Sequence, residues 1–98
     1  MEEKLLKDIS KSLRLSEDEL LRGGITSFLD RELREAYSEI EELKVKYGVK
    51  NTEDLERKIE RGEEGHPAWE ELIEWENIEN KIKEVEKWRN IPITGKEG

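Results

Sequence analysis

The feature that most constrains this fold is a run of apolar residues from Ile25 to Tyr47. They recur at spacings of three and four residues, and charged side chains fill most positions between them. This repeat is typical of one long amphipathic helix with a coiled-coil-like seam. A single helix leaves such a seam in water, so we expect another helix to cover it. The seam residues are Ile25, Leu29, Leu33, Ala36, Ile40, Leu43 and Tyr47.

A second apolar stripe, between Pro67 and Arg89, supplies the covering helix. Its members fall within about 140° of arc, the width of an ordinary buried face. Pro67 suits the first helical position, where its missing N–H does no harm. Spacings near 3.5 residues favour left-handed packing of the two helices at about +20°. The stripe consists of Ala68, Leu72, Trp75, Ile78, Ile82 and Val85.

Both ends of the long helix carry capping signals. Ser16 and Glu19 have the spacing of a capping box, so a helix starts there. Gly48 suits the left-handed position after Tyr47, and Val49 suits the apolar position that follows it in a Schellman motif. These signals predict a helix that ends at Tyr47.

Gly23 and Gly24 interrupt this pattern, because each costs a helix roughly 1 kcal/mol relative to alanine. Either the helix continues through them, or it breaks and restarts at a cap made by Ser27 and Asp30. A tolerated kink, close approach of another helix and a functional hinge are all open. The pair is no phosphate loop, because the glycine spacing and a preceding strand are missing.

A short helix is expected in the connection, over residues 52–61. Asn51 or Thr52 caps its start. Leu55 and Ile59 form its apolar edge, and Gly62 closes it. The predicted fold class is therefore all-α, with residues 16–90 forming a long antiparallel helical hairpin. Residues 91–98 are expected to be a flexible tail.

Residues 1–15 form a predicted N-terminal amphipathic arm. Leu5, Leu6, Ile9 and Leu13 fall near one helical face. Because the capping box restarts the helix at Ser16, we expect the arm to be separable from the hairpin. Its Leu5, Ile9 and Leu13 are candidate partner-binding residues.

Composition predicts an assembly rather than a large monomeric core. Only 33% of the 98 residues are hydrophobic, and 45% are charged. Each long stripe is wider than a two-helix contact needs, so we expect a homodimer with a four-helix-bundle-like core. The surplus of Glu and Lys, with opposite charges three or four residues apart, is typical of thermophile proteins.

Charge and residue usage exclude several classes of function. The net charge of −8 repels phosphate backbones, so nucleic acid is a poor partner. The absence of cysteine removes disulfides, thiolate zinc sites and cysteine nucleophiles. No apolar run approaches the roughly 20 residues of a membrane span, and no signal peptide is recognised. We expect a cytoplasmic protein without a cofactor.

His66 is the only histidine, and its spacing suggests two kinds of site. With Glu63 it has the Glu-x-x-His spacing of di-iron bundles, but Pro67 makes a shared helical turn improbable and the second motif is absent. With Arg61 it matches the Arg-x4-His spacing of HEPN-type ribonucleases, which place that pair on a helix. The favoured interpretation of His66 is an N-cap or a loop contact.

Glu70, Glu71 and Glu74 are candidate magnesium ligands, as in all-helical MazG-type pyrophosphohydrolases. That family pairs Glu-x-x-Glu with a downstream Glu-x-x-Asp, and no aspartate here has a glutamate three residues before it. A solvated charged face is the favoured interpretation. We predict no catalytic, metal-binding or cofactor-binding residue, with a magnesium-dependent nucleotide pyrophosphohydrolase as the alternative.

An apolar patch falls outside the stripe of the Pro67–Arg89 helix. Trp69 and Ile73 lie almost opposite the stripe, and Trp88 lies nearer to them than to it. Such a patch is covered either by the Leu55–Ile59 element or by another protein. Trp69, Ile73 and Trp88 are therefore candidate partner-binding residues.

Two stretches carry a resemblance to known families. LSEDELLRGGITSFLDREL resembles the two helices that follow the strand in ribbon-helix-helix repressors and many antitoxins, although no basic strand precedes Glu2. YGVKNTEDLERKIERGEEGHPAWEELIEWENIENKI is similar to small acidic helical antitoxin-like proteins of prokaryotic thermophiles. The resemblance implies a partner-binding role, and a DNA-binding repressor is a further alternative.

These observations predict a non-enzymatic protein-interaction module, of antitoxin-like type, that masks a basic partner such as a toxin nuclease. Acidity speeds the encounter with a basic protein, and tryptophans that become buried in the interface supply most of the affinity.

Deleting residues 1–13 tests the separable arm. We expect the remaining chain to keep its helical circular dichroism signal and cooperative unfolding, because the hairpin has its own apolar seam. Assembly or partner binding is expected to weaken. Loss of folding in the deleted chain would contradict the arm.

Overall fold

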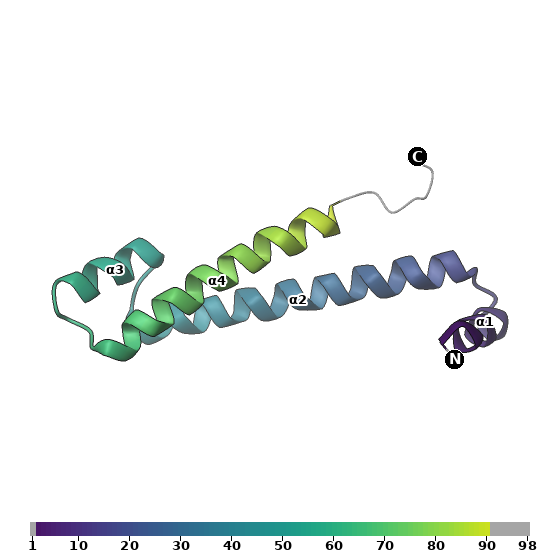
Figure 1. Cartoon of the computed structure of the whole chain (residues 1–98), viewed down its shortest axis with the longest axis horizontal. Coiled ribbons are helices and arrows are strands. Elements are labelled where there is room, and N and C mark those ends of the chain that lie inside the picture. Colours follow the sequence, from purple (N-terminus) through teal and green to yellow (C-terminus); the bar gives the residue numbers. More distant parts are fainter. Residues whose placement is uncertain (1, 91–98) are drawn as a thin grey trace.

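The computed structural model describes residues 2–90, and in this range it is all helical. Figure 1 shows α4 lying back along the C-terminal half of α2, with α3 at the closed end and α1 at the far end of α2. The all-α prediction is confirmed, and the predicted tail at 91–98 lies outside the described residues. The elements are α1 (Glu2–Leu13), α2 (Glu17–Tyr47), α3 (Thr52–Glu60) and α4 (His66–Arg89).

The start of α2 is fixed by the predicted capping box. The Ser16 hydroxyl accepts a hydrogen bond from the Glu19 amide, and the Glu19 carboxylate accepts one from the Ser16 amide, both at 2.9 Å. From there α2 runs unbroken through Gly23 and Gly24. The alternative of a break with a restart cap at Ser27 is therefore wrong.

The end of α2 is a Schellman motif, as predicted. Gly48 is left-handed with φ of 64°, and its amide donates to the Val45 carbonyl. The next amide, that of Val49, donates to the Lys44 carbonyl at 3.0 Å, and the Val49 side chain is buried. The motif satisfies carbonyls that the helix end would otherwise leave open.

The ends of α3 are also fixed by a capping side chain and a left-handed glycine, whereas the start of α4 has no side-chain cap. Asn51, rather than Thr52, caps α3 by accepting from the Asp54 amide at 2.8 Å, and Gly62 terminates the helix with φ of 75°. The N-cap of α4 is Gly65, so His66 is the first helical residue. This corrects two predictions, the start of the helix at Pro67 and the placing of His66 as a cap or in a loop.

The core lies where α3 and α4 meet the C-terminal half of α2. Trp75 and Leu55 are fully buried at its centre, one from α4 and one from α3. Leu33 and Ile59 pack against its edge. The buried set is Ala36, Ile40, Leu43, Tyr47, Val49, Leu55, Ala68, Leu72, Trp75, Ile78 and Ile82.

The two long helices differ in length, and this leaves the N-terminal part of α2 uncovered by α4. The last residue of α4, Arg89, is paired with Asp30 at 2.6 Å. Residues 17–29 of α2 therefore project beyond α4 (Figure 1). Ile25 was expected in the buried seam but is 47% exposed, because α4 ends before reaching it.

Trp75→Ala is expected to lower the free energy of unfolding by about 3–5 kcal/mol, because it opens a large cavity at the centre of the core. Trp69→Ala is the matched control, since that indole is about half exposed, and we expect about 1 kcal/mol or less. Urea unfolding followed by circular dichroism measures both. Equal losses would show that Trp75 is not the centre of the core.

Candidate functional site

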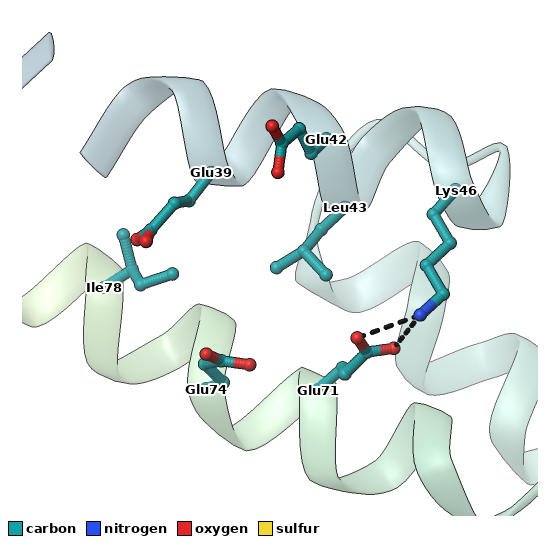
Figure 2. A pocket seen from close by; sticks show the side chains of 7 residues that line it. All are labelled: Glu39, Glu42, Leu43, Lys46, Glu71, Glu74 and Ile78. Carbon is teal, nitrogen blue, oxygen red and sulfur yellow. Dashed lines mark hydrogen bonds and ion pairs between the residues drawn. The ribbon is translucent and has the colours of Figure 1, made fainter. Parts of the chain in front are cut away.

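An acidic groove runs along one flank of the α2–α4 seam (Figure 2). Glu39 and Glu42 stand on the α2 side, and Glu71 and Glu74 stand on the α4 side. Its volume is about 280 Å³. Helical spacing places these carboxylates together: Glu39 and Glu42, like Glu71 and Glu74, are three residues apart and share a face. The remaining lining residues are Leu43, Lys46 and Ile78.

One end of the groove is closed by a polar network around Glu71. The Lys46 ammonium donates to both oxygens of this carboxylate, at 2.8 and 3.0 Å (Figure 2). The hydroxyl of the buried Tyr47 donates to the same carboxylate. Hydrogen bonds from Lys46 and then Tyr47 lower the pKa of Glu71. The Glu71 carboxylate in turn raises the pKa of Lys46.

The other three carboxylates, those of Glu39, Glu42 and Glu74, line the groove (Figure 2). Glu39, Glu42 and Glu74 make no ion pair with another residue in the range 2–90. Between them lies the apolar floor made by Leu43 and Ile78. An arrangement of this kind favours a long side chain that is apolar along its stem and cationic at its end.

The candidate magnesium ligands do not converge. Glu71 turns to Lys46, whereas Glu70 lies 3.3 Å from His66 one helical turn before it. Within the described part of the chain, no group of three His, Asp or Glu side chains is placed to hold a metal ion. The groove carboxylates form a surface of negative charge.

The pair Arg61 and His66 is also kept apart. Arg61 binds Glu63 at 2.7 Å in the loop after α3, which lowers the pKa of Glu63 and raises that of Arg61. His66 begins α4 and faces Glu70. Since Glu63 lies outside the helix, it does not share a helical turn with His66.

The predicted apolar patch on α4 is at the surface. Trp69 is 46% exposed and Ile73 is 45% exposed, so α3 leaves nearly half of each side chain uncovered. They are four residues apart and therefore adjacent on one face of α4. Trp88 is also exposed, at the opposite end of the helix, and does not share a continuous patch with them.

The candidate residues of α1 differ in exposure. Leu5 and Leu13 are exposed, and Ile9 is partly covered. The turn after α1 is held by Arg14 in the left-handed region, with φ of 58°, where the Leu15 amide donates to the Ser10 carbonyl. This places α1 across the start of α2 (Figure 1).

Sequence reasoning missed the acidic groove. Glu39 and Glu42 were not singled out, and Glu71 and Glu74 were assigned to a solvated face. The only signal was the placing of carboxylates beside Leu43 and Ile78, which mark the seam in both helices. Glutamate is so frequent in this chain that this signal is hidden.

The fold and the groove define an acidic all-helical hairpin protein. No helix within residues 2–90 has the length and apolar character needed to cross a membrane. The chain belongs to the family described as the uncharacterized protein MJ0235 family, whose model matches residues 1–91. No curated protein and no solved structure matches the chain.

Glu71→Gln tests the network that closes the groove. Because the folded-state pKa of Glu71 is lowered, its carboxylate stabilises the fold above its unfolded pKa of about 4.3 and loses this effect as pH falls through the folded value. We expect the variant to be less stable than wild type by about 1 kcal/mol at pH 7. Urea unfolding titrations of the variant and the wild type measure this difference in the free energy of unfolding.

The difference between Glu71→Gln and wild type should shrink as pH falls below about 4. Glu74→Gln is the control, since Glu74 makes no ion pair with a described residue. A difference that stayed constant from pH 7 to pH 3 would contradict the assigned role of the Glu71 charge.

Proposed function

We propose that the chain is a non-enzymatic protein-interaction module that binds a basic protein. The observation that carries the proposal is the acidic groove, in which Glu39, Glu42 and Glu74 surround an apolar floor. A lysine or arginine of a partner satisfies both parts of the groove. Its stem lies along Leu43 and Ile78, and its charged end donates hydrogen bonds to the carboxylates.

Charge beyond the groove supports the same kind of partner. A net charge of −8 attracts a basic protein over distances of about a Debye length and raises the association rate. Trp69 and Ile73 then supply apolar contact area, and Trp88 supplies more at the other end of α4. Half-exposed aromatic side chains are the common anchors of protein interfaces.

The biological role that we attach to this binding is masking. The antitoxin-like resemblance of the sequence suggests a partner such as a toxin nuclease, whose basic surface contacts nucleic acid. An acidic hairpin seated on that surface competes with the phosphate backbone for the same lysines and arginines. Leu5, Ile9 and Leu13 of α1 are part of the proposed binding surface.

We also propose that the protein acts as a homodimer in the cytoplasm. The support is the amount of apolar surface left open within residues 3–90, which includes Leu21, Ile25 and Phe28 of α2. Contiguous exposed apolar surface in a small protein favours association, and two-fold dimers are the commonest outcome.

Capture of the protein encoded by the adjacent gene tests the basic partner. The Glu42→Gln/Glu74→Gln variant is expected to bind it at least tenfold more weakly, and wild-type binding should weaken as salt is raised. The control is Glu56→Gln/Glu60→Gln, which changes net charge equally on exposed positions of α3. Titration with labelled partner measures the affinity of the wild type, the groove variant and the control variant.

Three results would contradict this proposal or part of it. Capture of no basic protein by the wild type would remove the masking role. Equal losses in the two glutamine variants would show that net charge acts and the groove does not. Unchanged affinity in a Trp69→Ala/Trp88→Ala variant would remove the tryptophans from the interface.

A further inference from the structure

The projecting part of α2 presents an apolar face that no other described element covers. Leu21, Ile25 and Phe28 are each about half exposed. They lie before Asp30, where α4 ends, and they remain exposed although α1 packs against the start of α2. Single exposed apolar side chains are common in soluble proteins, but three large ones clustered on adjacent turns are unusual.

A glycine lies in the middle of this face. Leu21, Gly24, Ile25 and Phe28 have the spacing i, i+3, i+4 and i+7, which places them on one side of the helix. The backbone of Gly24 is helical, so no left-handed conformation requires glycine there. A Cβ atom at Gly24 would meet nothing within 4 Å, so packing inside the chain does not require it either.

What Gly24 does provide is a place where a second helix can approach closely. The distance between packed helices depends on the side chains at the point of contact, and a glycine allows the shortest. Glycine weakens an isolated helix, and here it does so in a segment that α4 does not support. A neighbouring helix outside the chain explains both its presence and the exposed residues around it.

The charges around this face suit a second copy of the chain better than a basic protein. Residues 2–29 hold five basic and six acidic side chains, whereas the whole chain has a net charge of −8. Two such segments therefore meet with little repulsion. Further along the same face of α2 come Glu35, Glu39 and Glu42, which limits the overlap of two copies to the projecting part and the turn that follows it.

We propose that two copies pair through this face, with their α2 helices antiparallel and the two-fold axis between Gly24 and Ile25. The spacing is self-complementary about that axis. Leu21 then packs on Phe28 of the second copy, and Gly24 packs on Ile25 of the second copy, so that each contact occurs twice. The face would bury six large apolar side chains, three from each copy.

Charges at the ends of this pairing are compatible with it. Glu17 comes opposite Glu32 of the second copy, and the Glu32 carboxylate is held by Lys81 at 2.7 Å within its own chain. Its charge is therefore balanced before the two copies meet. The inference rests on the homodimer of the proposed function and is independent of the basic partner.

Substitution of the two neighbouring glycines distinguishes this pairing from a dimer that uses another surface of the protein. Gly24→Leu places a bulky side chain at the crossing, whereas Gly23→Leu places it about 150° around the helix from the two-fold axis. A Cβ atom at either position meets nothing within 4 Å, and leucine is the better helix former, so both variants should fold. Light scattering should give twice 11.6 kDa for wild type and Gly23→Leu. For Gly24→Leu we expect a dimer weakened at least tenfold.

A charge pair tests the register of the crossing. Leu21→Lys and Phe28→Glu should each weaken the dimer, because a charge then faces an apolar side chain. The double variant should restore it, because each introduced ammonium faces an introduced carboxylate of the second copy. Failure of the double variant to regain the dimer would overturn the proposed register.

The remaining outcomes distinguish this inference from the proposed function. A wild-type mass of one chain would overturn both the pairing and the homodimer, and would leave the face to another protein or to residues 91–98. A dimer that Gly24→Leu does not weaken would overturn this pairing and leave the homodimer standing. Capture of a basic partner is unaffected by either result.

Discussion

The structure depends on the burial of Trp75 between α2 and α3. Trp75 of α4 and Leu55 of α3 are fully buried in one cluster with Ile40 of α2, so a single core joins three helices. The indole N–H has no hydrogen-bond partner among the described residues. Burial of a large apolar surface therefore outweighs the cost of one unsatisfied donor. The core at the closed end of the hairpin is built in this way, and the groove lies beside it.

The order of helices was predictable because the signals are local. Capping residues such as Ser16 and Gly48 fix helix ends by hydrogen bonds within one turn, and the three-and-four spacing fixes which side of each helix is buried. Arg14 escaped prediction, since its left-handed turn carries no glycine to mark it. The chain accepts that strain because the turn also satisfies the end of α1.

The acidic groove could not be predicted, because it combines residues about 30 positions apart in the sequence. Periodicity shows that Leu43 and Ile78 face a partner, but it does not show which carboxylates then stand beside each other. The exposure of Ile25 was missed for a related reason. The repeat continues to Ile25, whereas the length of α4 decides how much of the repeat is covered. The length of α4 thus decides which part of one apolar repeat is buried and which part is exposed.

The polar contacts between α2 and α4 close loops of increasing length along the chain. Lys46 and Glu71 are 25 residues apart, Tyr37 and Glu86 are 49 apart, and Arg89 and Asp30 are 59 apart. The entropy lost on closing a loop grows with its length, so the contacts near α3 form at the lowest cost. We therefore expect the α2–α4 contacts to form first at the closed end of the hairpin, and the contact at Arg89 to open first. The projecting part of α2 begins just beyond this last contact, where α4 no longer supports the helix.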